Sequence, residues 1–258
     1  MNKTAQNRIE DIKKNGYTID FGNVFNLAFE NYKKIALYGG LVFFVFAVLF
    51  SLIGIAVLFS IFGTETILEN LKPDRFKPEN MDVNTILIFS AFSLLIRCLL
   101  SPFSGGLIKM AYCAERDEEF HVSTMFEYYK APYFTELFVA TFLITLTNTV
   151  ISRTLNYIQI PILDVVVSVT IGLFTIMMIP LIIFGNLKAL EAIQASILIV
   201  SKQPLVLLRL LVVGSIATMV GFIGCCIGIF FTLPFIYSLY FAIYSEIIGF
   251  DPEDEITI

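Results

Sequence analysis

Residues 204–244 of this 258-residue chain read PLVLLRLLVVGSIATMVGFIGCCIGIFFTLPFIYSLYFAIY and contain one charged side chain, that of Arg209. A helix rises about 1.5 Å per residue, so this run of about 40 residues is roughly twice as long as the ~30 Å hydrocarbon core of a bilayer. The run must therefore fold back on itself, and Gly221, Gly224 and Gly228 mark the turn. This stretch predicts two antiparallel membrane-spanning helices.

Four further apolar runs lie earlier in the chain, at residues 35–62, about 85–106, 134–158 and 165–184. Only helices and closed barrels satisfy all their backbone hydrogen bonds in lipid, and no segment shows the alternating pattern of a barrel strand. We therefore expect an all-α fold, a polytopic membrane helical bundle with six transmembrane helices, in a single integral membrane domain over residues 1–258. Residues 1–18 are expected to form a flexible cytoplasmic N-terminus, and residues 249–258 an acidic cytoplasmic tail.

The amino-acid composition indicates a membrane protein rather than a soluble domain. Hydrophobic residues make up 57% of the chain and charged residues 15%, whereas soluble domains contain about 45–50% and about 25%. The net charge of −5 gives no drive toward nucleic acid. The single histidine, His121, excludes a multi-histidine metal centre, and the four cysteines lack metal-ligand spacing. We expect no catalytic residues, no metal, no cofactor and no enzymatic activity.

The distribution of basic residues predicts the orientation of the bundle. Lys and Arg accumulate in the cytoplasmic loops of membrane proteins. Six of them precede the first span, and five more lie in the loops after the second and fourth spans, against four on the opposite side. Eleven against four predicts a multi-pass protein with both termini in the cytoplasm.

A short amphipathic segment precedes three of the six spans, at residues 21–32, 122–129 and 190–197. Each segment ends near a lysine whose ammonium group can reach lipid headgroups while its stem stays in the apolar zone. These candidate headgroup contacts are Lys33, Lys34, Lys130 and Lys202. Each even span also contains a proline, at Pro102, Pro180 or Pro234.

The order of surface helix, span and proline-containing span therefore occurs three times, and we interpret it as a threefold repeat of helix hairpins around one axis. The alternative is that interfacial helices and kinking prolines recur by chance, because both are common in membrane proteins. Sequence identity between the three units is weak.

The third span carries the most informative polar side chains. They form two rows spaced by four residues, and this half-polar face must turn toward protein or water rather than lipid. Arg97 lies near the middle of the second span, where a charge is costly, so we expect it to pair with Asp164 or with the region around Asn148. The candidate intramembrane polar site comprises Arg97, Thr145, Asn148, Thr149, Ser152, Arg153, Asn156 and Asp164.

The polar site leaves more than one function open. Its side chains either join helices through interhelical hydrogen bonds or line a path for a ligand. The leading hypothesis is a non-enzymatic membrane protein whose surface helices and basic cytoplasmic face engage anionic lipids or another membrane protein. The alternative is a small transporter or channel that uses the polar face of the third span. An intramembrane hydrolase has little support, because no HExxH motif and no paired intramembrane aspartates are present.

A resemblance to a known family rests on residues 192–213, AIQASILIVSKQPLVLLRLLVV, and 228–246, GIFFTLPFIYSLYFAIYSE. This region resembles a family of uncharacterised six-span bacterial integral membrane proteins that is related to the membrane region of certain glycerophosphodiester phosphodiesterases. The family's small-residue helix, Lys-x-Pro break, glycine-rich turn and Thr-x-Pro are matched by Ser196, Lys202, Gly224, Gly228, Thr232 and Pro234.

The resemblance is residue-specific over about the last 65 positions. It implies a protein of the bacterial cytoplasmic (inner) membrane that is associated with lipids or envelope upkeep and has no assigned reaction. Residues 1–258 hold no phosphodiesterase domain, so that activity is not carried over. The partners expected are membrane lipids or another membrane protein.

Overall fold

The computed structural model describes residues 3–70, 83–224 and 227–250, and these residues form helices and connecting loops without a strand. Within these ranges, six helical segments are long and apolar enough to cross a membrane. They cover Phe21–Ala56, Ile86–Glu115, Tyr133–Tyr157, Pro161–Ile183, Pro204–Ile223 and Gly228–Ile247. The predicted all-α helical bundle with six candidate spans is confirmed.

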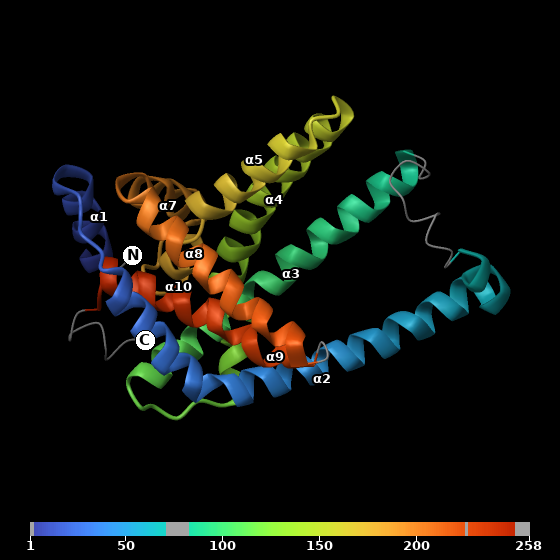
Figure 1. Cartoon of the computed structure of the whole chain (residues 1–258), viewed down its shortest axis with the longest axis horizontal. Coiled ribbons are helices and arrows are strands. Elements are labelled where there is room, and N and C mark those ends of the chain that lie inside the picture. Colours follow the sequence, from blue (N-terminus) through green and yellow to red (C-terminus); the bar gives the residue numbers. More distant parts are fainter. Residues whose placement is uncertain (1–2, 71–82, 225–226, 251–258) are drawn as a thin grey trace.

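The elements follow one another as α1 (Lys3–Asn15), α2 (Phe21–Asn70), α3 (Val83–Glu115), η3 (Val122–Tyr129), α4 (Tyr133–Tyr157), α5 (Pro161–Phe174), α6 (Met178–Ile183), α7 (Ala189–Lys202), α8 (Pro204–Met219), η4 (Val220–Gly224), α9 (Gly228–Thr232) and α10 (Pro234–Ile247). We call the end of the bundle with α1, η3, α7 and the last turn of α10 the termini end. The opposite end, where α2 stops and α3 begins, is the distal end. Figure 1 shows α2, α3 and the α4–α5 hairpin diverging from one another toward the distal end.

The N-terminal segment forms a helix rather than the predicted flexible tail. α1 packs against α7 and buries the side chains of Ala5 and Ile12. The Arg8 Nε donates a hydrogen bond to the carbonyl oxygen of Ile247 at 3.0 Å, which ties α1 to the end of α10. The prediction of a flexible segment over residues 1–18 is therefore wrong for residues 3–15. Residues 251–258 of the predicted acidic tail lie outside the described ranges.

α2 is a single helix of 50 residues, about 75 Å long at 1.5 Å per residue. Asp20 caps its start, because its Oδ1 accepts a hydrogen bond from the backbone N–H of Asn23 at 2.8 Å. The predicted surface segment at residues 21–32 therefore runs straight into the first span instead of forming a separate helix. No proline follows this segment, whereas Pro132 and Pro204 stop the other two.

η3 and α7 are the second and third surface segments, and each directly precedes a span. Pro102, Pro180 and Pro234 lie in α3, α6 and α10, so the order of surface segment, span and proline-containing span recurs along the chain. The three surface segments differ in form, being the start of a long helix, a 3-10 helix and a short α-helix. Packing of three units around one axis stays a prediction.

Pro102 lies inside α3 without breaking it. A proline lacks the N–H that would donate to the carbonyl oxygen four residues earlier, which here belongs to Cys98. The buried Ser101 hydroxyl donates to that carbonyl at 2.9 Å instead. The side chain thus replaces the missing backbone donor, and α3 continues to Glu115.

The predicted hairpin within residues 204–244 is confirmed, with α8 and η4 on one side of the glycine turn and α9 and α10 on the other. A Cβ atom at Gly228 would lie 2.4 Å from the carbonyl oxygen of Gly221. Only a residue without a side chain permits this approach of the two backbones. The glycines allow the turn because no side chain separates the two backbones at this point.

The hydrophobic core lies toward the termini end. Rings of Tyr112, Phe184, Phe241 and Phe250 contact one another there, with centroids 5.0 to 6.2 Å apart. These contacts join α3, the end of α6 and α10, and α2 packs along α10 beside them. This core holds the bases of the diverging helices in place.

Candidate functional site

A cleft of about 290 Å³ lies between α3 and α4. It collects most of the polar side chains that the sequence singles out in these two spans. Its lining consists of Ser90, Ser93, Leu94 and Arg97 from α3 and Thr145, Asn148, Thr149, Ser152 and Arg153 from α4. Leu94 is the one apolar residue in this set, and none of the lining residues is acidic.

Helical spacing explains why these residues face a common space. On α4, Thr145, Thr149 and Arg153 are four residues apart and therefore lie on one face. On α3, Ser90, Ser93 and Arg97 follow a spacing of three and then four, which also defines one face. The two serines were not among the predicted site residues, although their spacing to Arg97 is the signal that identifies them.

The two arginines lie at different depths in the cleft. Arg153 Nη2 donates a hydrogen bond to Ser90 Oγ at 2.9 Å, toward the distal end. Arg97 lies seven residues after Ser90 on α3, about 10 Å further toward the termini end. Within residues 3–70, 83–224 and 227–250, Arg97 has neither an ion pair nor a side-chain hydrogen bond, and Arg153 has the bond to Ser90. Both guanidinium groups thus keep free donors.

Asp164 does not pair with Arg97, contrary to one of the two predicted partners. Its Oδ2 accepts a hydrogen bond from Asn156 Nδ2 at 2.9 Å, which joins α5 to α4. Arg97 and Asn148, the other predicted neighbourhood, line the same cleft, but in the described part of the chain Asn148 Oδ1 accepts from Ser168 and no hydrogen bond joins it to Arg97. The carbonyl left without a donor by Pro102 also does not need Arg97, since Ser101 takes it.

Part of the polar stripe serves as interhelical contact. Asn148 Oδ1 accepts a hydrogen bond from Ser168 Oγ at 3.1 Å, and Asn156 contacts Asp164, so both asparagines connect α4 to α5. Thr145, Thr149 and Arg153 face α3 across the cleft instead. The stripe therefore divides into a packing side toward α5 and a cleft side toward α3.

The cleft is closed at its inner end by the core. The side chains of Leu137 and Ala140 on α4 are fully buried. A Cβ atom at Gly105 of α3 would lie 3.2 Å from the Tyr128 ring and 3.3 Å from the Ile183 side chain. α3, α4, η3 and α6 thus pack tightly at Gly105, eight residues or about 12 Å beyond Arg97 along α3.

The lysines proposed as headgroup contacts have several acceptors inside the protein. Lys34 Nζ donates to the carbonyl oxygen of Ala114 at 2.7 Å and also pairs with Asp117. Lys33 pairs with Glu30 at 2.7 Å. These contacts fasten the start of α2 to itself and to the end of α3.

The other two lysines lie on the surface at the termini end. Lys202 Nζ donates to the carbonyl oxygen of Lys13 at 3.0 Å, which connects α7 to α1. Lys130 is exposed, and its side chain has no hydrogen-bond partner in the part of the chain that the structure describes. Contact of the four lysines with lipid headgroups stays a prediction.

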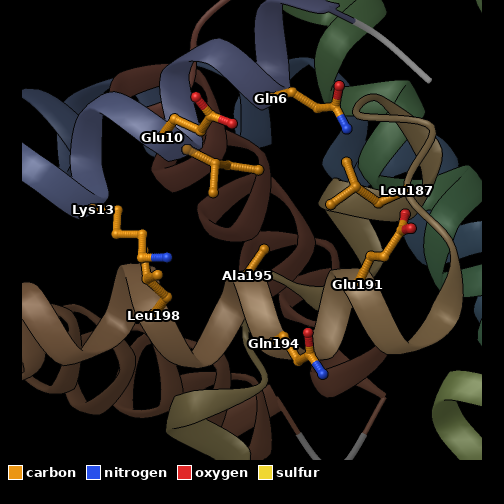
Figure 2. Close-up of a pocket in the computed structure, with 9 residues that line it drawn as sticks. Gln6, Glu10, Lys13, Leu187, Glu191, Gln194, Ala195 and Leu198 are labelled. Atoms are coloured by element: carbon orange, nitrogen blue, oxygen red, sulfur yellow. The ribbon is translucent and has the colours of Figure 1, made fainter.

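A second hollow, of about 340 Å³, lies between α1 and α7 at the termini end. Figure 2 shows Glu10 and Lys13 of α1 and Gln194 of α7 around it. Its lining mixes both signs of charge with apolar side chains such as Leu198. No single ligand chemistry matches this mixture, so we take the cleft between α3 and α4 as the candidate site.

The described residues contain no group of three or more His, Cys, Asp or Glu side chains arranged to hold a metal ion. Cys98 and Cys113 are buried free thiols. Cys225 and Cys226 lie outside the described residues.

Comparison with protein-family models, with curated proteins and with solved structures finds no match to this chain. The resemblance to six-span bacterial membrane proteins stays a prediction.

Proposed function

We propose that this chain is a non-enzymatic integral membrane protein of the bacterial cytoplasmic membrane that binds a lipid in the cleft between α3 and α4. The observation that carries the proposal is a polar cleft formed by two candidate spans. At this depth hydrocarbon offers no hydrogen-bond partners to Arg97, Thr145 or Thr149. An amphiphilic ligand whose polar part enters the cleft supplies them.

The surfaces beside the cleft fit the apolar part of such a ligand. On α3, Leu87, Ile88 and Phe92 are exposed, and on α4 Leu146 and Val150 are exposed. Within the bilayer these side chains already face hydrocarbon, so the acyl chains of a bound lipid pack along them through van der Waals contact. The combination of polar interior and apolar flanks is what a lipid requires.

The closed inner end of the cleft supports binding rather than conduction. A transport path continues as polar or water-filled space to the other side of the membrane. Here, beyond Arg97, Gly105 lies against Tyr128, Ile183 and Leu137, and the side chains of Leu137 and Ala140 are fully buried. A small transporter or channel therefore remains the second candidate, and it requires these helices to separate.

Filling the cleft tests the proposal. Thr149→Trp places a large ring in the cleft, and Thr170→Trp on the exposed side of α5 is the matched control. We expect lipid that copurifies in mild detergent, measured by mass spectrometry, to fall at least about twofold in Thr149→Trp only. Equal lipid content in both variants and wild type would contradict the proposal. Solute flux into liposomes that Thr149→Trp abolishes would favour the transporter.

The proposed orientation, with both termini cytoplasmic, rests on the count of basic residues in alternate loops. A reporter fused after Ile258 is expected to read cytoplasmic, and one inserted at Glu79 external. Activity at the C-terminus of a reporter that works only outside the cytoplasm would contradict this orientation.

A further inference from the structure

The cleft between α3 and α4 has an excess of positive charge. Arg97 and Arg153 are its ionised residues, and the lining includes no carboxylate. Asp164 of α5 is not part of the lining; its Oδ2 accepts a hydrogen bond from Asn156, and its Oδ1 is buried without a partner in the described residues. A cation entering this space would be repelled, whereas an anion would be attracted.

The uncharged lining residues are also suited to an anion. The hydroxyl groups of Ser93, Thr145 and Thr149 and the amide of Asn148 are all able to donate hydrogen bonds. An arginine presents several N–H donors in a planar fork that matches two oxygens of a phosphate. Arginines surrounded by hydroxyl donors form a set that recognises a group with several acceptor oxygens.

The membrane environment of Arg97 increases the stabilisation that a bound anion would provide. Arg97 lies near the middle of a candidate span, where an uncompensated charge costs at least ~2.5–3.5 kcal/mol on insertion scales. No ion pair compensates either arginine of the cleft in the described portion of the chain. An anionic ligand would neutralise the pair where the protein itself does not.

We infer that the cleft binds a phosphate ester anion between Arg97 and Arg153, and that the anion belongs to the headgroup of an anionic lipid. This inference rests on the proposed lipid-binding function and specifies the chemistry of the ligand. Arg153, positioned by Ser90, contacts the phosphate from the distal side, and Arg97 contacts it from the inner side. The exposed apolar side chains beside the cleft favour a lipid over a free phosphate as the source.

The test uses the full chain in nanodiscs that contain phosphatidylglycerol, phosphatidylcholine or a mixture of the two. The double variant Arg97→Gln/Arg153→Gln removes both charges, and Arg209→Gln, at an exposed arginine of α8 outside the cleft, is the matched control. We expect retained phosphatidylglycerol, measured by native mass spectrometry, to fall about tenfold or more in the double variant. Phosphatidylcholine binds weakly throughout, because its choline cation is repelled.

A second arm separates lipid from soluble phosphate. Inorganic phosphate and glycerol 3-phosphate are added to delipidated protein, and the melting temperature is measured. Stabilisation of wild type but not of the double variant, without preference for phosphatidylglycerol, would keep the phosphate site and overturn the lipid as its source. If the double variant and Arg209→Gln behave alike with every probe, the inference fails.

The two proposals fail in different ways. If Thr149→Trp releases lipid while the double variant retains phosphatidylglycerol as wild type does, the lipid site stands and the phosphate chemistry is wrong. If the double variant loses the response to glycerol 3-phosphate while Thr149→Trp retains lipid, the phosphate chemistry stands and the lipid site is wrong. If the double variant does not fold, the single variant Arg153→Gln replaces it. We expect Arg153→Gln to retain about tenfold less phosphatidylglycerol than wild type. Equal retention by Arg153→Gln and Arg209→Gln would overturn the inference.

Discussion

At the termini end, side chains between α2, α3, α6 and α10 are almost all buried, whereas toward the distal end α3 and α4 leave both polar and apolar side chains exposed. Among the described residues, the buried hydroxyls of Ser238 and Ser196 at the termini end have partners within the protein, and Asn31 Nδ2 is the exception. Ser238 Oγ, for example, donates to the carbonyl oxygen of Ala28 at 2.7 Å. The arginines of the cleft have few such partners. The difference indicates that one half is stabilised by its own packing and the other half is completed by the membrane.

The largest expected effect comes from adding one methyl group at a crowded glycine. A Cβ atom at Gly106 of α3 would lie 2.2 Å from the carbonyl oxygen of Met125 in η3, so Gly106→Ala forces η3 away from α3. We expect a loss of about 3 kcal/mol in the free energy of unfolding, or roughly 10 °C in melting temperature. Gly54→Ala in the distal half of α2, where nothing lies within 4 Å, should change stability by less than about 1 kcal/mol. Equal effects at the two sites would refute the contrast between the halves.

The next largest effect concerns a buried hydroxyl of α7 that contacts the junction between α5 and α6. Ser196 Oγ donates to the carbonyl oxygen of Phe174 at 2.7 Å and accepts from the N–H of Met177 at 3.2 Å. Ser196→Ala leaves these backbone groups unpaired in a buried place, which costs about 1–3 kcal/mol. Thermal unfolding in detergent measures this loss, and Ser201→Ala on the exposed face of α7 is the control. A change no greater than that of Ser201→Ala would show that the hydroxyl is dispensable.

Tyr17 gives the termini end a dependence on alkaline pH. Its hydroxyl donates to the carbonyl oxygen of Ile199 at 3.1 Å, and burial raises the pKa of Tyr17 well above its usual value. Because the folded state holds the proton more tightly than the unfolded state, this contribution to stability is complete below pH ~10 and is lost as the pH rises further.

We therefore expect Tyr17→Phe to cost about 1 kcal/mol at pH 7, from the lost hydrogen bond. The variant should also lose less stability than wild type between pH 9 and roughly pH 11, where the unfolded tyrosine ionises first. Melting temperatures measured across this range test both points. Parallel curves for the two proteins would argue against a protonated, buried Tyr17 as the cause.

The smallest effect is expected for an exposed ion pair. Lys33 and Glu30 are about half exposed or more and lie one turn apart on α2. Lys33→Gln should therefore reduce stability by no more than about 0.5 kcal/mol. Lys34→Gln is the informative comparison, because it also removes the bond to the Ala114 carbonyl that joins α2 to α3. Equal melting temperatures for the two variants would show that this junction adds no stability.

The six spans and the glycine turn were predictable because they depend on local composition. A long run without charge can be recognised as a span without knowing which helices pack against it. The turn at Gly221 and Gly228 follows because the last apolar run is longer than one bilayer thickness. α1 was not predictable in this way. Its residues are mainly polar, and its place depends on docking against α7 through few apolar side chains, among them Ile12.

The candidate site was predicted in part for a similar reason. Spacing identified the faces of the second and third spans that carry Arg97 and Arg153, because helical periodicity is a property of one segment. The choice between Asp164 and another partner depends on the rotation of α3, α4 and α5 relative to one another. The relative rotation of these helices cannot be predicted from a single sequence. The pairing of Asp164 with Asn156 is therefore visible only in the structure.

The continuity of α2 has a mechanical consequence. Beyond Gly40, where a Cβ atom would come within 2.5 Å of the Phe231 ring, α2 stays packed as far as Phe46, which contacts Phe103 and Phe126. From Phe46 to Asn70 the helix extends a further 24 residues without a break, about 36 Å at 1.5 Å per residue. A tilt of about 5° at the last packed turn would then displace the far tip by about 3 Å, given this lever length. The packing of Phe46 therefore sets where the distal tip of α2 lies.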